Sequence, residues 1–370
     1  MIPLNHNLDP LQRSGIRLYT NMAKEVPGCI MLTLGEPDFP TPQRIVDAAA
    51  EALQQGLTHY APNQGYAPLR QAIAAYENVD EECVLITVGA TGAIYTALTG
   101  ILNEGDEVIV PQPAFSLYET IATAAGAKTV KLDTRADGFQ ITKETLARAM
   151  TEKTKAIVIN SPNNPTGAVY SRESLDAVKQ AVLGKDIFVI CDDVYDRLSY
   201  DECPNLSRDA QLRPQILLCQ SFSKPWSMTG WRVGYLVAPK EILGRLLLLH
   251  AAEVAAVPTF LQAACVTALQ TDVSDMKEEY RRRRDFVVSR LEAMGLSCPR
   301  PAGAFYAFAD ISKFGLSSDE FCTRLIREAG VATVPGSCFG AEGYLRISYC
   351  CAMEALAEGL ERLETFLRKL

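Results

Sequence analysis

The chain has 370 residues, 48% of them hydrophobic and 22% charged, and a net charge of −8. This length and composition predict about two domains with a large core, and the acidic balance argues against a general nucleic-acid-binding protein. No apolar run approaches the roughly 20 residues of a membrane span, and the start of the chain lacks a signal-peptide pattern. We therefore expect a cytoplasmic protein with neither a nucleic-acid nor a membrane partner.

The eleven cysteines are scattered through the chain, without the spacing of a metal site or a disulfide framework. With only three histidines, the chain also offers little for a His-based metal site or a Ser-His-Asp triad. We expect reduced, mostly buried cysteines and no metal.

The first 40 residues show no strong periodicity and lead into a turn-rich stretch, LTLGEPDFPTP, that contains Gly35. Thr41 is expected to cap a helix whose first residue is Pro42 and which stops at Gly56. The next loop, THYAPNQGYAPLR, carries Tyr60, and aromatic residues on loops often have a function.

Short apolar runs recur at 83–88, 107–110, 156–159, 187–191 and 216–219, and most are followed by a helical pattern. Strands that alternate with helices predict a mostly parallel sheet with helices on both faces. In such sheets ligands bind beyond the carboxyl ends of the strands. Here those ends carry Thr91, Phe115, Asn164, Asp192, Tyr195, Ser221 and Lys224. We therefore expect one site at this edge of the sheet.

Two stretches at these ends indicate the chemistry. The turn 89–92 leads into a helix expected at 93–102, and the amino end of a helix favours a phosphate, although many such turns bind nothing. The stretch SFSKPWSMTGWRVG places Lys224 at the mouth of a buried strand, with Ser221 and Arg232 nearby. Lost hydration there lowers the pKa of the amine and makes it a nucleophile or base. The alternative is a solvated surface lysine.

The pattern changes beyond residue 275. A long helix is expected at 276–294, and alternating strands are expected at 303–308 and 344–349, which predicts an α+β unit. Within the last strand, Arg346 is costly to bury unless it meets an anion, either an acidic side chain or a bound carboxylate. We expect an amino-terminal segment (1–40) that joins a small carboxyl-terminal domain (276–370), and between them a large domain (41–275).

Six motifs in this order, LGEPDFPTP, YAPNQG, SPNNPTG, DDVY, SFSKPWSMTGWRVGY and YLRISY, resemble those of the class I/II aminotransferases. The resemblance covers nearly the whole chain. It implies the α/β fold of the aspartate aminotransferases, fold type I, with a helix-covered parallel sheet and a smaller α+β domain. It also implies pyridoxal 5′-phosphate as cofactor and a homodimer whose subunits share their active sites.

Carried over to this chain, the resemblance implies that Lys224 binds the cofactor as a Schiff base and carries a proton between the substrate and the cofactor. Asp192 would face the pyridine nitrogen and keep it protonated. Asn164 and Tyr195 would hydrogen-bond the phenolic oxygen of the ring, and Phe115 would stack on its face.

The same resemblance implies a phosphate site made of Ala90, Thr91, Ser221 and Arg232. Tyr60 would reach that phosphate from the partner subunit.

Substrate binding follows from the resemblance as well. Arg346, Asn164 and the backbone at Gly35 would bind the α-carboxylate, and Ile16 lies on a segment that covers the substrate side chain in relatives. Aspartate-specific members have a lysine at the position of Thr91 to meet the distal carboxylate. Its absence favours a broad or apolar amino donor, with 2-oxoglutarate as the acceptor.

The sequence thus predicts an aminotransferase that moves an amino group from an L-amino acid to a 2-oxo acid by a ping-pong mechanism. A pyridoxal-phosphate-dependent β-lyase acting on cysteine S-conjugates would use the same Lys224 and Arg346, so it stays open as an alternative. A non-catalytic binding or regulatory module would require a damaged site, and no key position is lost.

Overall fold

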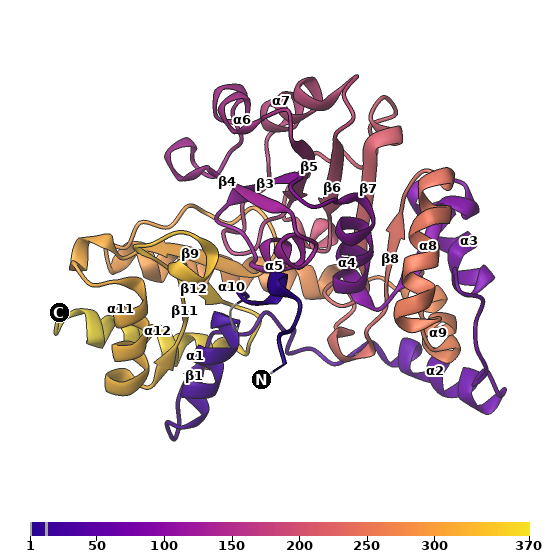
Figure 1. Cartoon of the computed structure of the whole chain (residues 1–370). Helices are drawn as coiled ribbons and strands as arrows, with labels where there is room; N and C mark the ends of the chain where they lie inside the picture. The colour runs from indigo at the N-terminus through magenta and orange to yellow at the C-terminus, as the bar shows by residue number, and fades with distance from the viewer. Residues whose placement is uncertain (1, 12–13) are drawn as a thin grey trace.

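The computed structural model describes residues 2–11 and 14–370. Its larger part is built on a seven-stranded sheet with the strand order β2-β8-β7-β6-β5-β3-β4 (Figure 1). The strands are β2 (Val84–Thr87), β3 (Glu107–Gln112), β4 (Lys128–Asp133), β5 (Thr154–Asn160), β6 (Phe188–Asp192), β7 (Ile216–Ser221) and β8 (Gly234–Val237).

Strand direction explains where the site lies. From β7 to β4 every neighbouring pair is parallel, and β8 is antiparallel to both β7 and β2. The carboxyl ends of β3, β5, β6 and β7 therefore lie along one edge of the sheet. The predicted mostly parallel sheet is confirmed.

Alternating apolar residues bury both faces of this sheet. In β6, Val189 and Cys191 pack into one hydrophobic cluster and Ile190 packs into another on the opposite face, as the period of two in a strand requires. The covering helices are α2 (Gln43–Gln54), α3 (Ala67–Glu77), α4 (Gly89–Ile101), α5 (Leu117–Ala124), α6 (Lys143–Ala149), α7 (Arg172–Val182), α8 (Lys240–Val254) and α9 (Thr259–Leu269).

The smaller part combines the two ends of the chain. In Figure 1 the indigo helix α1 (Gly15–Lys24) lies beside the orange and yellow carboxyl-terminal elements. The strand β1 (Ile30–Met31) pairs in parallel with β10 (Val331–Ala332). The remaining elements are α10 (Ser274–Ala293), β9 (Tyr306–Asp310), α11 (Ser318–Arg324), β11 (Val334–Pro335), β12 (Tyr344–Ser348) and α12 (Met353–Leu367), with the sheet order β11-β12-β9. The division at residues 41 and 276 stays a prediction.

Three expected boundaries are wrong. Thr41 does not cap α2, because its hydroxyl donates to the carbonyl oxygen of Ser227 at 2.7 Å, and Pro42 precedes the helix that begins at Gln43. The helix expected at 93–102 begins at Gly89, so the small-residue turn is itself the first turn of α4. The strand expected at 303–308 is β9, which begins only at Tyr306.

All eleven cysteines are free. None of the described helices has the length and apolar character needed to cross a membrane.

Candidate active site

A cavity of about 250 Å³ lies at the carboxyl edge of the large sheet, where β9 and β12 approach it. Every predicted site residue but one lines this cavity: Ile16, Gly35, Ala90, Thr91, Phe115, Asn164, Asp192, Tyr195, Ser221, Lys224, Arg232 and Arg346. The exception is Tyr60, which is 92% exposed and lies outside the cavity. The fold thus brings together residues that are more than 300 positions apart in the sequence.

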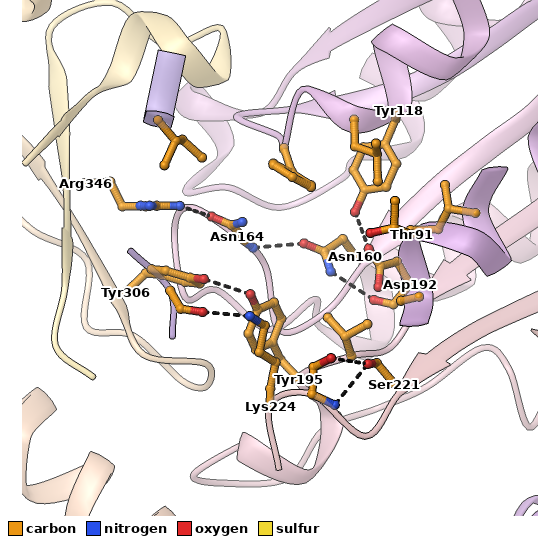
Figure 2. Close-up of a pocket in the computed structure, with 18 of the residues that line it drawn as sticks. Thr91, Tyr118, Asn160, Asn164, Asp192, Tyr195, Ser221, Lys224, Tyr306 and Arg346 are labelled. Atoms are coloured by element: carbon orange, nitrogen blue, oxygen red, sulfur yellow. Dashed lines mark hydrogen bonds between the residues drawn. The ribbon is translucent and has the colours of Figure 1, made fainter. Parts of the chain in front are cut away.

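Lys224 follows β7 and extends into the cavity (Figure 2). Its Nζ donates a hydrogen bond to the carbonyl oxygen of Gly35 at 2.7 Å. Enclosure by the cavity walls lowers its pKa to about 8, because burial disfavours the charged amine. This lysine can therefore act as a neutral nucleophile or base near neutral pH.

Asp192 is the last residue of β6 and is 5% exposed. The hydroxyl of Tyr118 donates to its Oδ2 at 2.5 Å, while Oδ1 is buried without a hydrogen-bond partner among the described residues. Burial raises the pKa of this carboxyl to about 6, against the opposing effect of the Tyr118 hydrogen bond. An unpartnered carboxylate oxygen beside a cavity is suited to a cationic N–H of a bound molecule.

A chain of hydrogen bonds crosses the cavity wall from Asp192 to Arg346 (Figure 2). The Asn160 amide donates to the backbone oxygen of Asp192 at 2.9 Å, and its Oδ1 accepts from the Asn164 backbone N–H at 2.9 Å. The Asn164 Oδ1 then accepts from Nη1 of Arg346 at 2.8 Å. These amides hold Asn164 and Arg346 in fixed positions relative to the sheet.

Arg346 is 1% exposed, and its other contacts among the described residues are neutral. Nη2 donates to the carbonyl oxygen of Thr33, and Nε has no hydrogen-bond partner among the described residues. The guanidinium lies 4.5 Å from the centre of the Tyr306 ring and 4.9 Å from that of Phe339. Burial lowers its pKa from the ordinary value. A buried cation with no carboxylate beside it can take the carboxylate of a ligand.

The opposite end of the cavity is suited to a phosphate. Gly89 has a φ of +65°, and a Cβ there would lie 2.8 Å from Nη2 of Arg232, so glycine lets this guanidinium reach the start of α4. The first N–H of α4 that bonds back along the helix is that of Gly92, which leaves the earlier N–H groups, including those of Ala90 and Thr91, for an anion. The Ser221 hydroxyl, 2.8 Å from that of Ser223, lines the same cavity.

Several cavity residues were not predicted. Tyr118 and Asn160 bind Asp192, and the Tyr306 hydroxyl lies 2.8 Å from that of Tyr195. Tyr306 stands in an apolar stretch where an aromatic residue is typical of a core, so the sequence carries no signal for it. Tyr118 follows the strand expected at 107–110, on the same stretch as Phe115, and that position is a signal. Asn160 could have been found, because it is a polar residue directly after an apolar run.

Comparison with known proteins gives a consistent picture. The family described as "Aminotransferase class I and II" matches residues 27–363. A probable N-acetyl-LL-diaminopimelate aminotransferase of Bacillus subtilis is 41% identical over 99% of this chain and 97% of its own length. An aromatic-amino-acid aminotransferase of Thermococcus litoralis is 38% identical over 99% of this chain and 98% of its own.

The fold has equally near neighbours among solved structures. The aspartate aminotransferase of Thermus thermophilus, determined with maleate, superimposes with a TM-score of 0.94. It is 37% identical and covers 100% of both chains. Three relatives of similar identity thus bear the names of three different substrates.

Proposed function

This chain belongs to the aminotransferase class I and II family and is a pyridoxal-phosphate-dependent aminotransferase, and we propose that it works by a ping-pong mechanism centred on Lys224. In the first half-reaction an L-amino acid leaves its amino group on the enzyme, and in the second a 2-oxo acid takes it up. The observation that carries this proposal is a single cavity that holds a lysine of lowered pKa, a carboxylate with a free oxygen and a buried arginine without a carboxylate partner among the described residues.

The residues present fit the cofactor. When bound, pyridoxal phosphate supplies a protonated pyridine ring that draws electrons away from the substrate α-carbon. The free Oδ1 of Asp192 would accept the pyridine N–H, while the Tyr118 hydroxyl donates to Oδ2. Tyr195 and Asn164 would hydrogen-bond the phenolic oxygen, and Phe115 would contact the ring; all three line the cavity.

The start of α4 and Arg232 would bind the phosphate. The N–H groups of Ala90 and Thr91 and the positive end of the helix dipole would favour the anion. The hydroxyl of Ser221 and the guanidinium of Arg232 would supply further hydrogen bonds.

The substrate is oriented by Arg346, Asn164 and the backbone at Gly35, which bind its α-carboxylate. Nζ of Lys224 then takes the proton that leaves the α-carbon and returns it when the product forms. The lowered pKa of Lys224 suits both directions, because its amine can be neutral as a base and protonated as an acid near pH 8.

The active unit in this proposal is a homodimer. Tyr60 is 92% exposed and does not line the cavity of its own chain, which is consistent with a role in the phosphate site of the partner subunit. Light scattering of the purified protein tests whether it is a dimer. Tyr60→Phe should bind pyridoxal phosphate more weakly than the wild type if Tyr60 contacts the phosphate of the partner subunit.

The amino donor in this proposal is broad or apolar. The charged side chains that line the cavity in the described part of the chain are Asp192, Lys224, Arg232 and Arg346, and each has a role above. Ile16 and Leu117 add apolar surface. The named relatives act on different substrates, so their names do not decide the donor, and 2-oxoglutarate is the acceptor that we propose.

The experiment is a donor screen with the holoenzyme. Each L-amino acid is added alone, and a donor converts the visible absorbance of the lysine-bound cofactor to that of the pyridoxamine form. No conversion by any donor would contradict the proposal. The β-lyase alternative is not favoured, because the relatives are named aminotransferases, and release of pyruvate and ammonia without an oxo acid would be its signature.

A further inference from the structure

We propose that Tyr306 is a positioning residue, whose hydroxyl donates to that of Tyr195 and thereby directs the Tyr195 proton toward the phenolic oxygen of the cofactor. The inference rests on the proposed function, because the role of Tyr195 is taken from there. Tyr306 itself comes from a different element, the first residue of β9.

The two hydroxyls form an isolated pair. Their oxygen atoms are 2.8 Å apart, and the rings meet edge to face with their centres 5.7 Å apart (Figure 2). Tyr195 is 4% exposed and Tyr306 is 2% exposed. Each hydroxyl has one proton to donate. If Tyr195 gives its proton to the cofactor oxygen, the proton between the two tyrosines has to come from Tyr306.

The Tyr306 ring is closely packed between Gly35 and Arg346. A Cβ on Gly35 would lie 1.9 Å from its oxygen, so Tyr306 fits only against a glycine. On the other side the guanidinium of Arg346 lies 4.5 Å from the ring centre. Among the residues that the structure describes, Tyr195 is the hydrogen-bond partner of this hydroxyl.

Donation from Tyr306 makes Tyr195 a better donor, because hydrogen bonds in a chain polarise one another. A stronger bond to the phenolic oxygen stabilises its anionic form and so favours loss of the proton from the lysine–cofactor linkage. The charged and titratable groups that face the pair are Arg346 and Cys350 from the β12 segment, Asp192 from β6 and Lys224 after β7. Tyr306→Phe changes none of these groups directly.

The test is a pH titration of Tyr306→Phe holoenzyme, read by the visible absorbance of the lysine-bound cofactor in the absence of substrate. We expect the pKa of the linkage to rise by about half a unit to one unit, the size of one hydrogen bond. The ring beneath Arg346 remains in this variant, so the KM for the amino donor should stay within about twofold. Tyr306→Leu removes the ring as well and should raise that KM.

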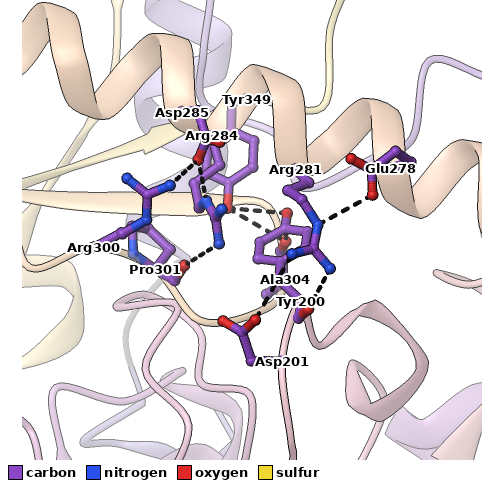
Figure 3. Close-up of polar contacts among 10 residues, drawn as sticks. All are labelled: Tyr200, Asp201, Glu278, Arg281, Arg284, Asp285, Arg300, Pro301, Ala304 and Tyr349. Carbon is purple, nitrogen blue, oxygen red and sulfur yellow. Dashed lines mark hydrogen bonds and ion pairs between the residues drawn. The ribbon is translucent and has the colours of Figure 1, made fainter.

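Tyr349→Phe is the matched control. Tyr349 and Tyr200 form a second buried hydroxyl pair, 3.2 Å apart, and neither lines the cavity (Figure 3). This variant should titrate like the wild type. An unchanged pKa in Tyr306→Phe, or an equal shift in Tyr349→Phe, would overturn the inference. Failure of the wild-type enzyme to convert any donor would instead overturn the proposed function, so the two failures are distinguishable.

Discussion

Two buried arginines of the smaller part of the molecule show opposite environments. Arg284 of α10 is 4% exposed, its Nε pairs with Asp285 at 2.7 Å, and its Nη1 donates to the Pro301 carbonyl at 3.2 Å (Figure 3). Arg346 is 1% exposed and has only neutral acceptors and aromatic rings around it in the described structure. A buried cation costs free energy unless an anion compensates it. Arg284 has its anion within the fold, whereas we propose that the anion of Arg346 is the substrate carboxylate.

Neighbouring aspartates differ in the same way. Asp193 accepts a hydrogen bond from the Asn205 amide at 2.7 Å and does not line the cavity. Asp192 lines it and keeps one oxygen free. The alternation of a strand end turns these two residues to opposite sides. The free oxygen beside the cavity therefore distinguishes Asp192 from Asp193, whose hydrogen-bond partner lies within the fold and whose pKa burial raises well above its ordinary value.

The largest effect is expected from Asp192→Asn. This change removes the charge that keeps the pyridine nitrogen protonated while retaining the shape of the side chain, so kcat should fall at least about a hundredfold. Steady-state kinetics with saturating cofactor measure it. Asp193→Asn is the control. It should lower thermal stability and leave kcat much closer to the wild-type value than Asp192→Asn does. Equal losses of kcat in both variants would contradict the different roles assigned to the two aspartates.

Arg346→Met comes next. Loss of the paired, charge-assisted hydrogen bonds to the α-carboxylate should raise the KM of the amino donor about 10- to 100-fold. The free energy of unfolding should change by only about 1 kcal/mol. Removing an uncompensated buried charge stabilises the fold, and this gain offsets the cost of leaving the oxygen atoms of Asn164 and Thr33 without their hydrogen-bond donor. Urea unfolding of the same preparation checks this second expectation, and a large stability loss without a KM change would reverse our assignment.

Arg284→Met should show the reverse pattern. It removes an ion pair, a backbone hydrogen bond and a contact 4.6 Å from the Tyr200 ring centre, so we expect a loss of about 2 kcal/mol in the free energy of unfolding. The KM of the donor should stay at its wild-type value. A raised KM would show that α10 acts on the substrate site after all.

The smallest effect concerns two lysines. Lys179 pairs with Asp209 at 2.6 Å, whereas in the described part of the chain Nζ of Lys224 has the neutral Gly35 carbonyl as its hydrogen-bond partner. Because the folded pKa of Lys224 is about 8, below its ordinary value, the amine is mostly protonated below pH 8 and neutral above it. The rate at which apoenzyme captures pyridoxal phosphate should therefore rise with pH, be about tenfold lower at pH 7 than on its plateau, and level off above pH 8. Stopped-flow absorbance measures this profile, and a rate that climbs steadily toward pH 10 would contradict the lowered pKa.

The comparison also explains what the sequence could predict. Asp192, Ser221 and Lys224 end apolar runs or follow them, and parallel strands carry such ends to one edge, so local pattern was enough to place them together. Arg346 was recognisable because a charge inside an apolar strand needs an explanation. Tyr306 was not, because its neighbours Phe305 and Phe308 make it look like another core aromatic. Its position depends on Gly35, which lies 271 residues earlier and meets it only after folding.

The predicted starts of α2 and α4 are wrong for a related reason. Thr41 has the residue type of a helix cap, but a tertiary partner, the carbonyl of Ser227, takes its hydroxyl. The sequence pattern predicts the start of α4 at residue 93, four residues after its true start at Gly89. The first turn of the helix consists of glycines and other small residues, which resemble a loop. That misplaced turn is the one that we assign to the phosphate.

We propose that Lys224 is the residue that binds the cofactor. Borohydride reduction of the holoenzyme fixes the cofactor on the lysine that holds it, and peptide mass spectrometry then locates the modification. We expect the added pyridoxyl phosphate on the peptide that contains Lys224, and none on that peptide in Lys224→Ala. Modification of a different lysine in the wild-type enzyme would contradict the account.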